Sequence, residues 1–214
     1  MLANTLEAIL NKSEGERAAY QFLKKNPVVV LWSFLRIGGH SQYVLAEFPI
    51  GIRYRADFVI LYEYSGGWDV HLIELEPIHD PVITKNGRPS KRLNSAISQV
   101  NDWAEYIETN RLQVKQDLSD WCIRHDLLGW DSPVDNPDDT PDIKNPDYYV
   151  KFYYHVIIGR RKAITKEKRR KMNQWQRTGV IAIGTYDRFL DVARNMDYRD
   201  THPNDHVWLA EIKE

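Results

Sequence analysis

Hydrophobic and polar positions follow two different periods along the first part of the chain. Between Ser13 and Pro27, apolar side chains recur every three to four residues, which predicts an amphipathic helix. Ser13 is its expected N-cap, and Asn26-Pro27 is its expected stop. Four later runs rich in β-branched and aromatic residues predict strands. These runs occupy residues 28–35, 42–48, 54–64 and 68–76.

A hairpin and a long helix are predicted next. The last two strand runs are joined by Ser65-Gly66-Gly67, a short glycine turn that is typical of antiparallel hairpins. Residues 78–90 are rich in proline and glycine and predict a loop. One helix is expected from about Ser90 to Arg124, because an apolar stripe repeats at helical spacing. The stripe consists of Ala96, Val100, Trp103 and Ile107.

The C-terminal part is predicted to alternate strands with helices. Strands are expected at residues 149–159 and 180–185, with a last edge strand at 206–212. Helices are expected at about 165–177 and 186–195. A mixture of antiparallel strands and flanking helices predicts an α/β or α+β fold, a three-layer sandwich with a mixed central β-sheet.

Length and composition fit one domain. With 214 residues, 43% of them hydrophobic, and a net charge of -1, we expect a single domain over residues 1–214. It would have N-terminal helices within 1–26, a core over 27–214 and an acidic surface loop at about 130–147. The lone Cys122 excludes an intramolecular disulfide and a cysteine-cluster zinc site, which suits a cytoplasmic protein. No apolar run approaches the roughly 18 residues that span a bilayer, so no membrane association is expected.

Charge is distributed unevenly in spite of the balanced total. Residues 160–177 hold nine Lys or Arg against one acidic residue, whereas 131–147 hold six Asp against one Lys. A basic helix can neutralise nucleic-acid phosphates without reading sequence, although many charged helices are only solvated faces. Arg160 and Arg161, directly after a predicted strand, are the best placed of these cations for contact with DNA.

Carboxylates on the predicted hairpin carry the candidate chemistry. The hairpin places Asp57 on one strand and Glu74 and Glu76 on its neighbour, and side chains two apart on a strand share one face. Carboxylates from adjacent strands can converge on one hard cation, and oxygen-only ligation suits Mg²⁺ or Mn²⁺. Such an ion can activate water and stabilise the charge that develops in phosphodiester hydrolysis. The alternative is a solvent-facing strand end.

The order and spacing of several segments resemble the Shedu family of anti-phage nucleases, a branch of the PD-(D/E)XK superfamily. The segments are ERAAYQFLKKNP, ADFVI, WDVHLIELEP, SKRLNSAISQVNDW, YYHVIIGR and VIAIGTYDRFL, and they span about residues 14–191. The resemblance implies a restriction-endonuclease-like fold, Mg²⁺-dependent cleavage of DNA and a homo-oligomer. It also implies that Glu16 is a first-helix carboxylate of the site, that Asp57 and Glu74 are metal ligands, and that Gln99 is a polar residue facing them.

Glu76 departs from the superfamily pattern, in which a lysine stands at this position. In one outcome, Glu76 supports a metal or acts as a general base, and another cation does the electrostatic work of the lysine. Arg92 is a candidate because it precedes Gln99 by seven residues and lies about 20° from it on a helical wheel; Lys91 and Lys85 are others. In the other outcome, the domain binds DNA without cutting it.

Three functional hypotheses follow. The first is a Mg²⁺- or Mn²⁺-dependent DNA endonuclease that acts on foreign DNA, with Glu16, Asp57, Glu74, Glu76 and Gln99 in its site and Lys91, Arg92, Arg160 and Arg161 in contact with DNA. The second is a nuclease-fold module that binds DNA or regulates but has lost turnover. The third is a self-associating structural domain of a defence assembly.

Overall fold

A mixed β-sheet forms the centre of the protein. The computed structural model describes residues 1–12, 15–35, 41–64, 66–125 and 142–201. Within these residues the sheet has five strands in the order β1-β2-β3-β4-β5; β1, β2 and β3 pair antiparallel, whereas β3, β4 and β5 pair parallel. The strands are β1 (Gln42–Ile50), β2 (Tyr54–Tyr64), β3 (Gly67–Leu75), β4 (Tyr149–Ile157) and β5 (Ile181–Gly184).

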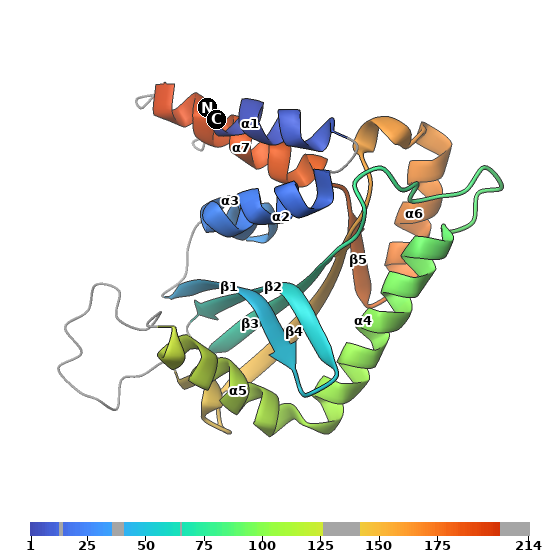
Figure 1. Ribbon diagram of the computed structural model, residues 1–214. Helices are drawn as coiled ribbons and strands as arrows, with labels where there is room; N and C mark the ends of the chain where they lie inside the picture. The colour runs from blue at the N-terminus through green and yellow to red at the C-terminus, as the bar shows by residue number, and fades with distance from the viewer. Residues whose placement is uncertain (13–14, 36–40, 65, 126–141, 202–214) are drawn as a thin grey trace, which may run out of the picture.

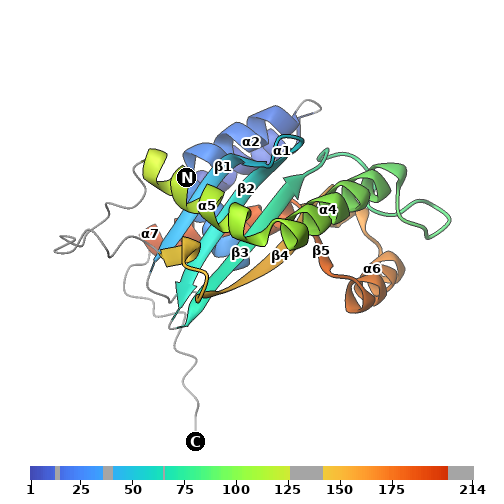
Figure 2. The ribbon, with the colours of Figure 1, turned by 90° about the horizontal axis from the view of Figure 1, so that it is seen from below.

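Helices cover both faces of this sheet (Figure 1). One face packs against α1, α2, α3 and α7, and the other packs against α4 and α5, which cross the strands in Figure 2. The bounds are α1 (Leu2–Leu10), α2 (Gly15–Lys25), α3 (Pro27–Phe34), α4 (Lys91–Thr109), α5 (Arg111–Arg124), α6 (Lys166–Thr178) and α7 (Asp187–Thr201), with short 3₁₀ turns at Asp142–Lys144 and Arg161–Ala163. The predicted three-layer sandwich is therefore confirmed.

The alternation of side chains along β2 and β3 divides the core between the two layers. Val59 and Leu72 pack on the α4–α5 side, whereas Phe58 and Ile73 pack on the α1–α3 and α7 side. Both sides are apolar because each strand is covered by helices on both faces. The predicted apolar stripe of α4 is confirmed, since all four of its side chains are buried.

Residues 28–35, predicted to be a strand, are mostly helical. Pro27 occupies the first turn of α3, where its missing N–H costs no hydrogen bond and its fixed φ suits a helix. The buried side chains of Val29 and Val30 join the core formed with α7. Tertiary burial thus overrides the weak strand preference of a valine run.

The predicted long helix at 90–124 is two helices. α4 ends and α5 begins at Asn110, whose backbone has φ -120 and ψ 33, and whose side-chain amide donates to the carbonyl of Tyr106. The bend allows α5 to continue along the sheet and bury Val114, Leu118 and Cys122.

One further prediction differs from the structure in its extent, and others fall on residues that the structure does not describe. α7 continues to Thr201, beyond the expected end at 195. The last strand at 206–212, Ser13 and most of the acidic loop lie outside the described residues. None of the helices in the described part of the chain is both long and apolar enough to cross a bilayer.

Candidate functional site

The site lies where β2 and β3 separate. Their antiparallel register reaches the pair Phe58 and Ile73, so Asp57 and Glu74 are the next two residues at the point of divergence. β3 continues beside β4 through Leu75. In place of a ladder bond, the Asp57 Oδ2 atom accepts a hydrogen bond from the backbone N–H of Leu75 at 2.7 Å. The Asp57 carboxylate therefore occupies the opening between the two strands.

An irregularity in β2, where the alternation of side chains between the two faces is interrupted, places Asp57 in this opening. Ala56 packs on the α4–α5 side and Phe58 on the opposite side, although residues two apart on a regular strand share a face. The neighbouring strand changes at the same level, where Glu47 has a positive φ of 57°. A left-handed conformation costs a non-glycine residue about 1–2 kcal/mol. Such strain is typical of functional sites, so its position beside Asp57 is notable.

Glu74 is held from the other layer of the sandwich. Its Oε1 atom accepts a hydrogen bond of 2.9 Å from the Gln99 side-chain amide on α4. Burial, followed by the charges of Asp57 and Glu76, raises the pKa of Glu74 to about 8, and the hydrogen bond from Gln99 opposes this rise. Burial likewise raises the pKa of Asp57 to about 6, in spite of the Leu75 N–H, and the charge of Glu16 adds to the rise. The surroundings thus disfavour the ionised form of both carboxyls in the metal-free protein, and a bound cation would favour it.

Glu76 is paired with Arg92. Glu76 is 7% exposed, and its Oε2 atom lies 2.5 Å from Arg92 Nε, in the first turn of α4. Burial raises the pKa of Glu76, and the Arg92 guanidinium works against this rise. Arg92 and Gln99 lie on one stripe of α4 and contact Glu76 and Glu74, respectively. A cation thus enters the acidic cluster by way of α4, although β3 carries no lysine at this point.

Glu16 approaches from the other side of the sheet. It stands in the first turn of α2, with an exposed side chain, and lines a pocket of about 570 Å³ together with Tyr20, Asp57 and Leu75. Its charge raises the pKa of Asp57 and of Glu76, which shows that the three carboxylates are close enough to interact. The structure therefore brings together all five residues predicted for the site: Glu16, Asp57, Glu74, Glu76 and Gln99.

A cation would have to be held mainly by two carboxylates. No group of three or more His, Cys, Asp or Glu side chains in the described residues is arranged to hold a metal ion. Mg²⁺, however, keeps several of its waters and commonly binds through one or two carboxylates and substrate phosphates. Asp57 and Glu74 fit such a site, because they are adjacent and a cation would offset the cost of ionising them in this buried position. The donor set therefore suits Mg²⁺ or Mn²⁺ and not a fully protein-ligated ion.

The basic residues predicted to contact DNA fall into two groups. Lys91 and Arg92 begin α4, with Lys91 exposed. Arg160 is 6% exposed; its guanidinium pairs with Asp187 at 3.2 Å and donates to the carbonyl of Leu10 at 3.1 Å. A guanidinium used in this way joins α1 to α7 and is not available to a phosphate. Arg161 pairs with Asp191 at 2.5 Å.

Tyr186 is part of the site but carries no local sequence signal. It is fully buried, and its hydroxyl has no hydrogen-bond partner among the described residues. Burial raises its pKa well above 10, and the charges of Glu16, Asp57, Glu76 and Glu74 add to this rise. In the sequence it reads as the first residue of an amphipathic helix. Only the packing of that helix start against the acidic cluster identifies it.

Comparison with known protein families identifies a match that covers most of the chain. The family model described as Shedu protein SduA, C-terminal, matches residues 13–190. This range includes every residue of the acidic cluster, Gln99, Arg92 and Tyr186. No curated protein matches the chain.

Proposed function

Because the chain belongs to the Shedu protein SduA, C-terminal, family, whose role is anti-phage defence, we propose that it is a metal-dependent DNA endonuclease. It would hydrolyse phosphodiester bonds of foreign DNA with a site of the PD-(D/E)XK type. The observation that carries the proposal is the meeting of Asp57 and Glu74 where β2 and β3 separate, at a buried position that disfavours their ionised forms in the absence of a cation.

In this proposal, two carboxylates bind the metal ion and their neighbours hold these carboxylates in position. Asp57 and Glu74 would hold Mg²⁺ or Mn²⁺, and such an ion, when bound, activates water and stabilises developing negative charge on a phosphate. The Leu75 N–H fixes the carboxylate of Asp57, and the Gln99 amide fixes that of Glu74. Glu16, at the open side of the pocket, would orient waters around the ion. Fixed ligands limit the reorganisation needed during the reaction.

The pair of Glu76 and Arg92 would replace the usual lysine. Glu76 binds the Nε side of the guanidinium, which leaves the terminal nitrogens of Arg92 free to donate. Since the side chain of Arg92 is 53% exposed, these nitrogens can reach a phosphate oxygen from solvent. In this arrangement Glu76 is a positioning residue, and Arg92 supplies the positive charge.

Plasmid cleavage tests the proposal. Supercoiled plasmid would be incubated with the protein in Mg²⁺, in Mn²⁺ and in EDTA, alongside Asp57→Ala, Glu74→Ala and the control Glu105→Ala. Glu105 is an exposed carboxylate nearer the other end of α4. We expect nicked or linear product only with metal, only from the wild type and the control. Equal cleavage by Asp57→Ala, or cleavage in EDTA, would refute the proposed site.

A second candidate is a DNA-binding or regulatory module without turnover. It is favoured by the extra negative charge of Glu76 and by the lack of a three-ligand cluster in the described residues. Retention of DNA in every metal, with no cut product, would support it. A protein that self-assembles but has no affinity for DNA at low salt would instead support a structural domain of a defence complex.

A further inference from the structure

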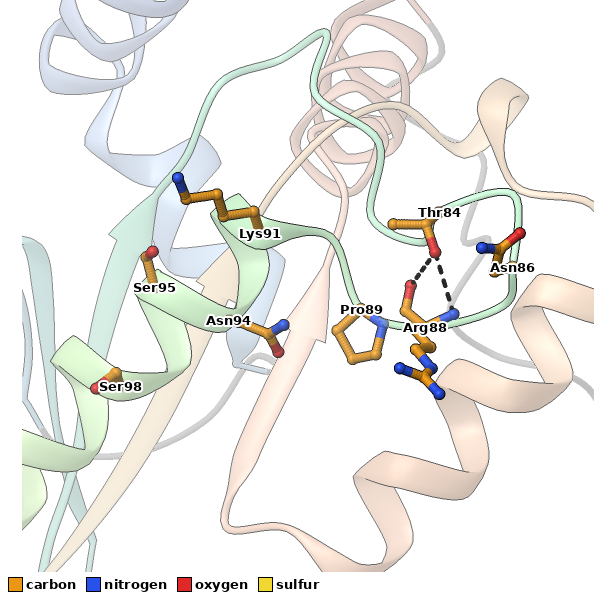
Figure 3. Close-up of a pocket in the computed structure, with 8 residues that line it drawn as sticks. All are labelled: Thr84, Asn86, Arg88, Pro89, Lys91, Asn94, Ser95 and Ser98. Carbon is orange, nitrogen blue, oxygen red and sulfur yellow. Dashed lines mark hydrogen bonds between the residues drawn. The ribbon is translucent and has the colours of Figure 1, made fainter.

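A polar groove runs along the N-terminal part of α4, the helix that also carries Arg92 and Gln99 (Figure 3). Its volume is about 900 Å³. One wall is the turn at residues 84–88, and the other is the exposed flank of the first turns of α4. From α4 the groove is lined by Lys91, Asn94, Ser95 and Ser98.

The turn that forms the first wall is closely braced. Thr84 Oγ1 donates to the carbonyl of Arg88 at 3.0 Å and accepts from its N–H at 3.2 Å, as the dashed lines in Figure 3 show. The flanking residues Ile83 and Pro89 form a β-bridge. Gly87 has a φ of 73°, a left-handed conformation that favours glycine, and the Lys171 amine of α6 lies against it. The wall is therefore preorganised, which lowers the entropy cost of binding a ligand.

The chemistry of the groove differs from that of the acidic cluster. Its lining contains two cations, Arg88 and Lys91, with hydroxyl and amide side chains, and it contains neither a carboxylate nor an aromatic ring. Both cations are exposed, and neither pairs with a carboxylate of the described residues. Unpaired cations and hydroxyls suit phosphate oxygens. Grooves for single strands instead stack the bases on aromatic rings, so this lining favours the backbone of a duplex.

The groove and the acidic cluster share one helix. At about 100° per residue, the groove residues of α4 lie about 60–160° around the helix from Arg92, with Ser95 the nearest and Asn94 the farthest. A strand held along the groove would therefore reach the acidic cluster by moving around one side of the helix. α6, whose Lys171 touches the turn, stands beside this end of α4 in both ribbon views and offers further exposed cations (Figures 1 and 2). These are Lys166, Arg169 and Arg170.

We propose that this groove binds the phosphate backbone of double-stranded DNA, without reading sequence, and guides one strand to Asp57 and Glu74. The proposal rests on the proposed endonuclease function and adds Arg88 and the flank of α4 as the surface that positions the substrate. It predicts a binding energy that depends on salt, because each phosphate contact releases counterions.

Binding measured without cleavage tests this groove. The anisotropy of a labelled DNA duplex would be followed in EDTA over a range of salt concentrations. The protein would be the wild type, the double variant Arg88→Ala/Lys91→Ala and the control double variant Lys25→Ala/Arg53→Ala. Lys25 ends α2, and Arg53 lies by the C-terminal end of α4, so the control removes the same charge away from the groove. A single strand of the same length would be measured in parallel.

The slope of the logarithm of the DNA-binding constant against the logarithm of the salt concentration reports the number of phosphate contacts. We expect the groove variant to lose about two units of slope, since each phosphate contact contributes about 0.9, and the control to keep the wild-type slope. Equal slopes in the wild type and the groove variant would overturn the proposal that the groove binds DNA. A control variant that lost as much slope as the groove variant would also overturn it. If the groove variant lost as much slope with single-stranded DNA as with the duplex, the assignment of the groove to double-stranded DNA would be overturned. Because EDTA prevents metal-dependent cleavage, these results stand apart from the plasmid assay: binding that depends on the groove can persist in a protein that never cuts, and cutting can persist without the groove.

Discussion

Replacement of Glu74 by glutamine should stabilise the metal-free protein, and more so as the pH rises. Burial and the charges of Asp57 and Glu76 raise the pKa of Glu74 to about 8 from an ordinary value of 4.5. Between these values the folded state keeps a proton that the unfolded state has lost. The folded state therefore binds more protons in this window, and its stability falls as the pH rises from 4.5 to 8. Glutamine removes this loss, since it has no proton to release.

The size of the effect follows from the shift. At about 1.4 kcal/mol for each unit of pKa, a change from 4.5 to about 8 corresponds to about 5 kcal/mol above pH 8. Below the ordinary pKa of 4.5 the contribution vanishes, because Glu74 is then protonated in both states. The stability of Glu74→Gln relative to the wild type should accordingly grow by a few kcal/mol from acidic to mildly alkaline pH. Such a gain would equal a large part of the stability of an ordinary domain.

Urea unfolding in EDTA is the assay. The free energy of unfolding of the wild type, Glu74→Gln and the control Glu105→Gln would be measured at about pH 5 and about pH 8.5, either side of most of the titration. The control loses the same formal charge from an exposed position on α4. Saturating Mg²⁺ should stabilise the wild type more than Glu74→Gln, because a ligand that binds only the folded state adds to its stability.

Two results would refute this reasoning. If the difference between Glu74→Gln and the wild type were the same at both pH values, Glu74 would not titrate as its burial and neighbours require. If Glu105→Gln gained as much as Glu74→Gln, the effect would be one of net charge and would not arise in the acidic cluster.

Two further predictions concern buried polar groups. Tyr186→Phe should raise the free energy of unfolding by about 1 kcal/mol in metal-free urea titrations, because it removes a buried hydroxyl that lacks a partner among the described residues; a loss of stability would show that the hydroxyl is bonded. His71 and His155, joined at 2.9 Å, have pKa values lowered to about 4 and about 3, chiefly by burial and then by nearby charges including Arg188. Since the unfolded state alone gains protons below pH 6.5, each histidine should cost about 2 kcal/mol of stability between pH 6.5 and 5. In urea unfolding, His155→Gln should lose about half as much stability as the wild type between pH 6.5 and 5, because only one of the two histidines remains. If the variant lost as much stability as the wild type, the lowered pKa of His155 would be contradicted.

The neighbourhood of Asp57 and Glu74 was predictable because it depends on short-range features. A glycine turn between two strand-like runs sets an antiparallel register, and that register brings these residues to the same level of the sheet. In the same way, the spacing of Arg92 and Gln99 on one helix was enough to place both on a common stripe. Their contacts with Glu76 and Glu74 follow once α4 packs on the sheet.

Other features depend on partners that are distant in the sequence. The valine run of α3 is helical because it is buried against α7. From the sequence, Arg160 is expected to be exposed like other arginines that follow a strand. In the structure it is buried, because it pairs with Asp187 and donates to a carbonyl at the end of α1. Nothing around Tyr186 in the sequence indicates that the charges of four carboxylates act on its hydroxyl.

By itself, therefore, the sequence determined the order of most elements, the hairpin, the apolar stripe of α4 and the acidic residues that meet on β2 and β3. These depend on backbone periodicity and on turns a few residues long. Only the tertiary structure decided which cations are free, which carboxyls are buried, and where the strands become irregular, at Glu47 and Asp57. Burial and charge compensation arise from all the elements that pack around a group, so residues near it in the sequence cannot fix them.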